Sequence, residues 1–157
     1  MPPPVLVDPT KLDLERVLFG PEEIRRRNPH RHEMELLHGI VHYDPEAGEI
    51  AGFVDLAEDA FWARGHIPGR PLFPGVLMIE AAAQLCSFYY KDQFPEVPFF
   101  GFAGIEEVRF RATVVPGDRL VLIGRRHQFN HRRASFDTQG LVGESVAFQA
   151  RIIGMRV

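Results

Sequence analysis

Two ionisable side chains, fourteen positions apart, lie in surroundings that suit acid–base chemistry. His66 belongs to residues 64–75, where three prolines and three glycines exclude regular secondary structure. Glu80 lies in the apolar run that follows, and an ionised carboxylate there must be paired, solvated or protonated. Imidazole titrates near neutral pH, so a histidine together with a carboxyl group in a dry place can supply a general base and a general acid. We therefore predict that His66 and Glu80 are catalytic.

The junction between this segment and the apolar run offers a site for an oxyanion. Pro74 and Gly75 suit the start of a helix, where the first backbone N–H groups lack partners and the helix dipole is positive. Glycine has no side chain to keep a ligand oxygen away from the backbone. Gln84 lies one helical turn from Glu80 on the same face. The predicted residues for oxyanion or substrate binding are Gly75, Val76, Pro74 and Gln84.

Both predicted catalytic residues also have a plainer structural interpretation. A single histidine in a loop is common, and Glu80 on a buried helix can emerge at the surface or join a structural network. A stiff loop rich in glycine and proline is costly unless a specific shape is needed, which favours a functional role for His66.

The rest of the chain indicates the elements that must position these residues. Residues 74–90 are apolar on nearly every face, which is typical of a buried helix. Six segments rich in Leu, Ile, Val and Phe predict strands at residues 34–43, 49–56, 99–114, 119–129, 133–141 and 145–156. This order predicts an α+β fold, in which a curved antiparallel sheet of about six strands wraps around one long buried helix.

The length of 157 residues fits a single domain, which we assign to residues 1–157, with residues 1–28 as an N-terminal arm. Residues 1–9 carry four prolines and predict an extended, loosely held segment. One or two helical turns are expected at 13–18, and a short helix begins at Pro21. The first residues lack the basic start and apolar stretch of a signal peptide or anchor, so we expect neither, and no run approaches the length of a transmembrane helix. We therefore expect a cytoplasmic protein without membrane insertion.

Composition and charge exclude several other classes of function. The formal net charge is −3, so nothing indicates nucleic-acid binding over the whole chain. The one cysteine, Cys86, cannot form an internal disulfide and is expected in the core. The histidine pairs His30–His32 and His38–His42 lack a third ligand at suitable spacing, so we expect no metal.

Residues 65–84 resemble a known family signature. The chain reads Gly65-His66-Ile67-Pro68-Gly69-Arg70-Pro71-Leu72-Phe73-Pro74-Gly75-Val76-Leu77, followed by Glu80-Ala81-Ala82-Ala83-Gln84. This is similar to the Gly-His-Phe-Pro-Gly-x-Pro-x-x-Pro-Gly-Val-Leu and Glu-Ala-x-Ala-Gln pattern of the 3-hydroxyacyl-acyl-carrier-protein dehydratases of type II fatty acid synthesis. Weaker similarity, including Pro29-His30-Arg31, extends the resemblance over residues 24–125.

The resemblance implies a hot-dog fold and an active site shared across a homodimer, which in this family often assembles into a trimer of dimers. It implies dehydration of (3R)-3-hydroxyacyl chains to trans-2-enoyl chains on the phosphopantetheine of acyl carrier protein, without a metal or organic cofactor. His66 of one subunit would take the C2 proton, and Glu80 of the other would help the C3 hydroxyl leave. The Gly75 amide would bind the thioester oxygen.

Two alternative functions stay open beside this one. An acyl thioesterase shares the fold and the substrate class, although hot-dog thioesterases lack this histidine and glutamate pattern. A non-catalytic acyl-binding domain is the second alternative, because positions that line the family's tunnel differ here, among them His38 and Ile67. Glutamate rather than aspartate at position 80 favours the dehydratase branch over the branch that also isomerises the double bond.

Overall fold

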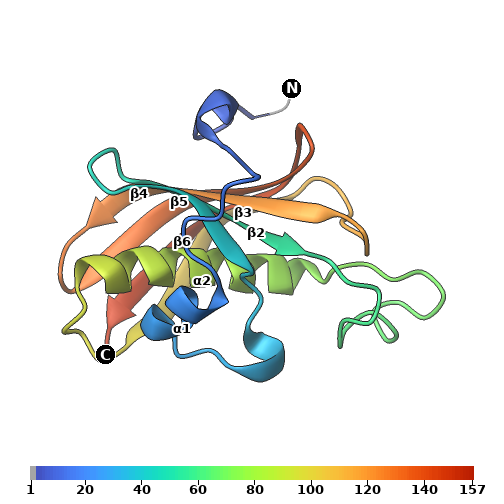
Figure 1. Ribbon diagram of the computed structural model, residues 1–157, viewed down its shortest axis with the longest axis horizontal. Helices are drawn as coiled ribbons and strands as arrows, with labels where there is room; N and C mark the ends of the chain where they lie inside the picture. Colours follow the sequence, from blue (N-terminus) through green and yellow to red (C-terminus); the bar gives the residue numbers. More distant parts are fainter. Residues whose placement is uncertain (1–2) are drawn as a thin grey trace.

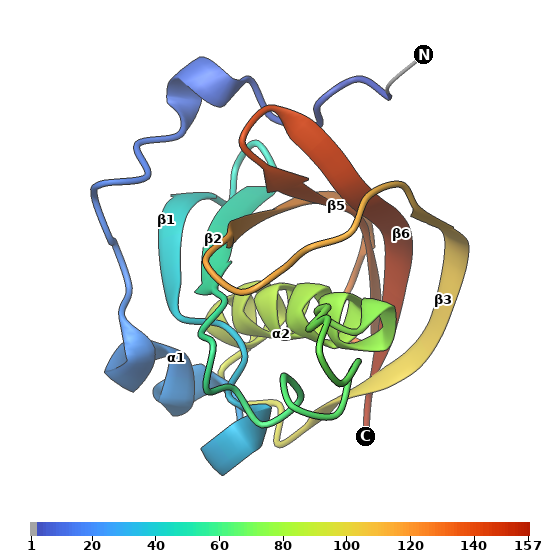
Figure 2. The same cartoon turned by 90° about the vertical axis from the view of Figure 1, so that its right-hand side faces the viewer.

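The long helix α2 (Gly75–Gln93) crosses the concave side of a six-stranded antiparallel sheet in the computed structural model, which describes residues 3–157 (Figure 1). The end-on view shows the sheet curving around this helix (Figure 2). The strands are β1 (Gly39–Asp44), β2 (Glu49–Asp55), β3 (Phe100–Phe110), β4 (Arg119–Phe129), β5 (Arg133–Val142) and β6 (Ser145–Arg156). Their order is β1-β2-β4-β5-β6-β3, so β1 and β3 are the edges. The predicted α+β architecture is confirmed.

Helix α2 is buried along most of its length, as its apolar sequence predicts. Ala81 and Ala82 have no exposed surface, and their small side chains let the helix lie close to the sheet. Tyr89 and Tyr90 are also fully buried, and their hydroxyl groups donate to backbone carbonyls in the β1–β2 and β4–β5 turns. Within residues 3–157, no helix is long and apolar enough to span a membrane.

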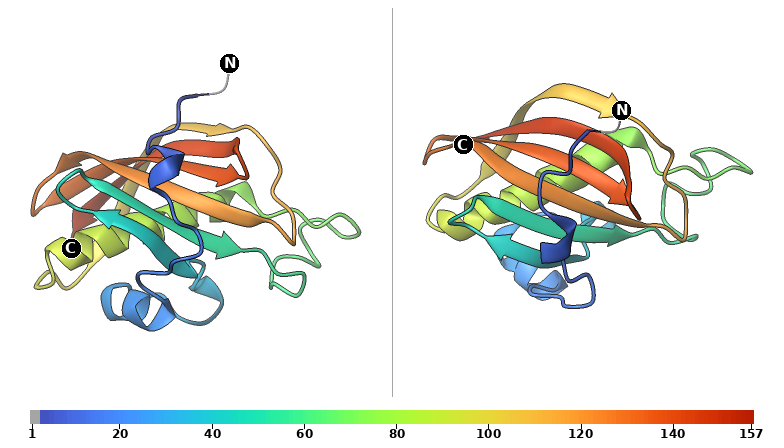
Figure 3. Two further views of the ribbon diagram at one scale, coloured as in Figure 1. Left: turned by 45° about the horizontal axis from the view of Figure 1, so that its top comes forward. Right: turned by 90° about the horizontal axis from the view of Figure 1, so that it is seen from above.

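The strands place apolar side chains on both faces of the sheet. On β4, Leu120 and Leu122 face α2, whereas Val121 and Ile123 belong to a second apolar cluster on the outer face. The N-terminal segment crosses this outer face, on the side of the sheet away from α2 (Figure 3).

The N-terminal arm is held more firmly than the sequence predicts. Val7 is 1% exposed within the outer cluster, and the Leu6 amide donates to Gln139 Oε1 at 2.9 Å. The Gln139 amide in turn donates to the Pro4 carbonyl at 2.8 Å. The prediction of a loosely held arm is therefore wrong for the described part of residues 1–9, and residues 1–2 lie outside the described chain.

The first predicted strand begins later than expected. Residues His32–Met34 form a short 3-10 helix, η2, and β1 starts only at Gly39. Leu36 and Leu37 are buried, but the Leu36 amide donates to the side chain of Gln84 instead of joining a strand. The Gln84 side chain therefore accepts the hydrogen bond of a buried amide that would otherwise need a partner on a neighbouring strand.

Helix α1 (Pro21–Arg27) forms as predicted, with proline at its start. The region before α1 differs from the prediction in two ways. Residues 13–18 form no helix: they contain a turn at 14–15, and the amides of Leu18 and Phe19 donate to the Ile40 carbonyl in β1. A short 3-10 helix, η1 (Pro9–Lys11), precedes them.

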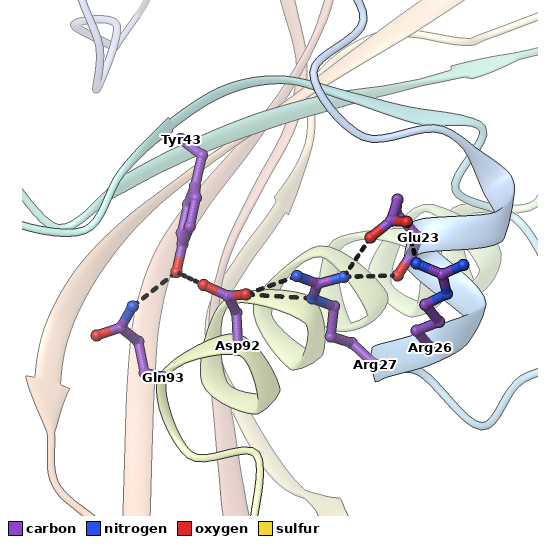
Figure 4. A network of polar contacts seen from close by, with 6 residues as sticks. All are labelled: Glu23, Arg26, Arg27, Tyr43, Asp92 and Gln93. Atoms are coloured by element: carbon purple, nitrogen blue, oxygen red, sulfur yellow. Dashed lines mark hydrogen bonds and ion pairs between the residues drawn. The ribbon is translucent and has the colours of Figure 1, made fainter.

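Polar contacts fix α1 to the C-terminal end of α2 (Figure 4). Arg27 donates to Asp92 Oδ1 from Nε at 3.2 Å and from Nη2 at 2.9 Å, and it also pairs with Glu23 on its own helix. The Tyr43 hydroxyl donates to the other Asp92 oxygen at 2.6 Å. Because α1 leads directly into residues 28–38, this anchor positions the segment that packs against the middle of α2.

Candidate active site

His66 lies in a long loop, residues 56–74, that projects beyond the N-terminal end of α2 (Figure 1). Its Nδ1 is 2.9 Å from the Leu72 carbonyl oxygen, a distance at which Nδ1–H donates to that oxygen. A proton on Nδ1 leaves Nε2 with a free lone pair, which is the form a general base requires. The residue is exposed, so a reacting group can approach it.

The loop has a defined course, although it contains no strand or helix. Trp62, within the loop, packs against Phe73 near the loop's end, with 5.2 Å between their ring centroids. Gly69 has a φ of 77°, a left-handed conformation that glycine adopts readily. Besides the bond from the imidazole, a backbone hydrogen bond of 2.7 Å runs from the Leu72 amide to the His66 carbonyl. The glycine- and proline-rich segment therefore holds the imidazole in place, as its composition indicates.

Helix α2 begins at Gly75, so the predicted oxyanion residues lie at a helix start. The first intrahelical acceptor is the Pro74 carbonyl, which leaves the Gly75 and Val76 amides without an intrahelical partner. A Cβ atom on Gly75 would lie 2.8 Å from a ring atom of Phe110, so a larger residue requires that ring to move. Val76 is 75% exposed, which places these amides at an accessible end of the helix.

Glu80 is on the second turn of α2, with a partly buried side chain. Its Oε1 accepts a hydrogen bond from Gln84 Nε2 at 3.0 Å and lies 3.3 Å from His30 Nε2. Burial by itself would raise the pKa of Glu80, but the hydrogen bonds from His30 and Gln84 and the charge of His30 bring that pKa below its usual value. The carboxyl group therefore favours its ionised form at neutral pH.

Gln84 supports Glu80 from the next turn of the helix. It is 2% exposed, and its Nε2 donates both to Glu80 and to the Met34 carbonyl, the latter at 2.7 Å. Its Oε1 accepts from the Leu36 amide at 3.1 Å. The sequence predicts substrate binding for Gln84, but both of its amide hydrogens are engaged within the chain, and the contacts in the structure hold Glu80.

A cavity of 120 Å³ lies beside Glu80. Besides Glu80 and His30, its walls include the aromatic side chains of Phe99, Phe100 and Phe102, at and before the start of the edge strand β3. Apolar walls with a few polar groups are the usual lining of a ligand site. The cavity connects the carboxylate of α2 with the edge of the sheet.

No hydrogen bond or ion pair joins His66 to Glu80 within residues 3–157. His66 is bonded to the backbone of its own loop, whereas Glu80 faces His30 and the cavity bounded by β3. Within one chain, the two predicted catalytic residues therefore make separate sets of contacts.

A family model described as the FabA-like domain matches residues 28–151. The chain belongs to the FabA-like family. This FabA-like chain is 40% identical over 100 residues to 3-hydroxyacyl-[acyl-carrier-protein] dehydratase FabZ from Fusobacterium nucleatum, an alignment that covers 63% of this chain and 70% of the relative. The resemblance to acyl-carrier-protein dehydratases that residues 65–84 indicate is confirmed.

Solved structures share the fold of this FabA-like chain at low sequence identity. The dehydratase heterocomplex ApeI:P from Xenorhabdus doucetiae matches with a TM-score of 0.73 and 17% identity, covering 85% of this chain and 90% of that chain. Cj0977, a sigma28-regulated virulence protein from Campylobacter jejuni, matches with a TM-score of 0.62 and 15% identity, covering 89% and 94%. These likenesses show the fold alone, and the predicted hot-dog fold is confirmed.

The contact between His30 and Glu80 is the part of the site that sequence reasoning missed. In the sequence, His30 is recognisable only as one of two nearby histidines that lack a third metal ligand, and as part of the short family-like tripeptide. Across the described residues 3–157, no group of three His, Cys, Asp or Glu side chains is arranged to hold a metal ion. The tripeptide Pro29-His30-Arg31 was the available signal, but no spacing rule connects residue 30 to residue 80.

Proposed function

We propose that this chain dehydrates (3R)-3-hydroxyacyl chains on acyl carrier protein to trans-2-enoyl chains, with His66 and Glu80 as its catalytic residues. The observation that carries the proposal is the set of groups around α2: an exposed imidazole with a free Nε2, two amides at the helix start, and a carboxylate beside an apolar cavity. Membership of the FabA-like family and the 40% identity to an acyl-carrier-protein dehydratase support it.

The reaction removes a proton from C2 and a hydroxyl group from C3 of the acyl chain. His66 Nε2 takes the C2 proton while negative charge moves to the thioester oxygen, to which the Gly75 amide donates a hydrogen bond. The C2–H electron pair then forms the double bond as the C3–O bond breaks. Glu80 orients the hydroxyl, which accepts one proton from the pair of catalytic residues and leaves as water. The pair gains one proton and gives up one, so its total number of protons is unchanged at the end of the reaction.

We propose that the site is completed by a second copy of the chain paired along β3. This edge strand has eleven residues, and Phe102, Ile105 and Phe110 on it are 48%, 44% and 53% exposed. An exposed apolar edge strand with free backbone groups readily pairs with another strand. Because the cavity beside Glu80 is bounded by this edge, a partner there would bring its projecting His66 loop toward that cavity. Assembly of such dimers into a trimer stays a prediction.

The carrier protein is proposed to dock beside the His66 loop. Arg64 and Arg70 in the loop are exposed, and so is Arg111, which follows Phe110 close to Gly75. None of these arginines takes part in an ion pair within residues 3–157, so their charge is available to an acidic partner. We further propose a cytoplasmic reaction that uses no metal or organic cofactor, because the acyl chain arrives on the carrier's own phosphopantetheine.

The reverse reaction provides a direct test. Hydration of a crotonyl thioester of carrier protein removes the conjugated double bond, so the enoyl absorbance should fall when the protein is added. His66→Ala and Glu80→Gln should each slow this change by about 100-fold or more, whereas His127→Ala, on an exposed histidine of β4, should not.

Two other outcomes would replace the proposal. Release of free thiol without hydration would favour a thioesterase. Stable binding of short and long enoyl chains by folded, dimeric protein, with no change in absorbance, would favour a non-catalytic acyl-binding domain.

A further inference from the structure

We propose that His30 is a positioning residue that fixes one oxygen of Glu80, so that the other oxygen is presented to the acyl chain. The proposal rests on the catalytic role proposed for Glu80 and deepens it. His30 comes from the segment between α1 and β1, far in sequence from the helix that carries the carboxylate.

The two oxygens of the Glu80 carboxylate have different surroundings. Oε1 lies within 3.3 Å of His30 Nε2 and 3.0 Å of Gln84 Nε2. No hydrogen bond or ion pair to Oε2 is present among residues 3–157. Glu80 and His30 both line the 120 Å³ cavity beside β3. Oε2 is therefore the oxygen that is available to the C3 hydroxyl of a bound chain.

The backbone that carries His30 is fixed to α2 on both sides of the histidine. Before it, the Asn28 side-chain amide donates to the Gln84 carbonyl at 2.9 Å, and Arg27 is bonded to Asp92. After it, the Leu36 amide donates to the Gln84 side chain. Because these bonds tie the segment to the same helix that carries the carboxylate, the imidazole is held in place before substrate arrives.

The other ring nitrogen of His30, Nδ1, takes no part in the contact with Glu80. His30 Nδ1 and Asn28 Oδ1 are buried without a hydrogen-bond partner among the described residues, and Asn28 is 3% exposed. Both residues line a second cavity, of 240 Å³, together with Gln84. A cavity of this size has room for a water molecule that donates to the Nδ1 acceptor. With Nδ1 as an acceptor, the imidazole carries its hydrogen on Nε2, the nitrogen that faces Glu80.

Removal of His30 should therefore change both the rate and its dependence on pH. The hydrogen bond from His30 stabilises the ionised carboxylate and so lowers the pKa of Glu80. Without His30 this pKa rises. In hydration the ionised carboxylate orients the attacking water by accepting a hydrogen bond from it, so the acidic limb of the rate profile should move to higher pH.

The test compares three substitutions of His30 in the crotonyl hydration assay with the full-length protein. His30→Ala should lower kcat by about 10- to 100-fold, with a smaller change in KM, and move the acidic limb upward. His30→Gln places an amide nitrogen near the position of Nε2 and should restore most of kcat, whereas the shorter His30→Asn should not. His42→Ala is the matched control, because it breaks a pair of the same kind, His42 Nε2 to Glu49 Oε1 at 3.2 Å, away from Glu80.

The outcomes separate this proposal from the proposed function. A normal kcat and pH profile in His30→Ala, with Glu80→Gln inactive, would overturn the role of His30 alone. Full activity of Glu80→Gln would overturn the proposed function. In the Glu80→Gln background, His30→Ala should add no further loss, and an equal additional loss would also contradict the proposal. If His30→Ala does not fold, equal activities of the Gln and Asn variants would overturn it.

Discussion

The side-chain oxygen of Gln84 accepts a hydrogen bond of 3.1 Å from the backbone amide of Leu36. Residues 35–38 belong to no strand, so a side chain of the helix takes the place of a strand partner for this buried backbone. The same side chain donates to Glu80, which couples the path of the segment before β1 to the orientation of the carboxylate.

Gln84→Ala is expected to destabilise the protein. The substitution leaves the Leu36 amide and the Met34 carbonyl without their partner, and an unsatisfied buried polar group costs about 1–3 kcal/mol. Urea unfolding should show a lower midpoint by a corresponding amount. Gln128→Ala, at an exposed position on β4, should stay within about 0.5 kcal/mol of the parent. Equal midpoints for the two variants would contradict the bridging role of Gln84.

Gly75→Ala is expected to reduce activity more than stability. The added Cβ would lie 2.8 Å from Phe110, so the ring and the helix start must separate, which moves the amides proposed to bind the thioester oxygen. A loss of about tenfold or more in kcat is expected in the crotonyl assay, since one lost oxyanion donor typically costs 100-fold or more. Gly20→Ala, where an added Cβ meets nothing within 4 Å, serves as the control.

A second substitution tests whether Gly75→Ala acts by forcing the Phe110 ring and the helix start apart. Phe110→Ala removes the ring that the new methyl group meets, so the double variant should recover activity relative to Gly75→Ala, both being compared with Phe110→Ala alone. Failure to recover would mean that the glycine matters for a reason other than its contact with Phe110.

Mixed dimers should test whether the active site is shared between two chains. His66→Ala and Glu80→Gln homodimers are each expected to be inactive. After subunit exchange in equal amounts, half of the dimers are mixed and each has one intact site, so about a quarter of the parental activity should return. The control mixes His66→Ala with the double variant, which yields no intact site. If exchange is complete and activity does not return, the two residues do not act across an interface.

The N-terminal arm is expected to contribute to stability. Val7 is 1% exposed in the outer cluster, so Val7→Asp would bury an unpaired charge and should cost about 2–4 kcal/mol in the free energy of unfolding. The matched change Val157→Asp, at a residue that is 77% exposed, should have little effect. Chemical denaturation of both variants checks this, and a small effect at Val7 would show that the arm is dispensable for stability.

The sequence predicts the central elements because their signals are local. The helix at residues 75–93 is recognisable from a long apolar run after Pro74, and the strands at 119–129 and 145–156 from their residue types and turns. The loop around His66 is recognisable because glycine and proline spacing is itself the family signature.

The remaining features depend on contacts between distant parts of the chain. Leu36 and Leu37 are typical strand residues, but whether they pair depends on Gln84, which lies nearly fifty positions away. The approach of His30 to Glu80 depends in the same way on how α1 is tied to α2 through Arg27. Local patterns hold no information on such pairings, so the supporting contacts of the carboxylate became visible only in the folded chain.

The outer cluster determines the directions from which other molecules can reach the sheet. On β4, Val121 and Ile123 are 6% and 1% exposed beneath the N-terminal arm, while Leu120 and Leu122 are covered by α2 on the other side. The middle of the sheet is therefore enclosed between two layers contributed by the same chain. Another molecule can therefore pair with the sheet at an edge strand or contact it at the strand termini, because packing within the chain covers both faces of β4.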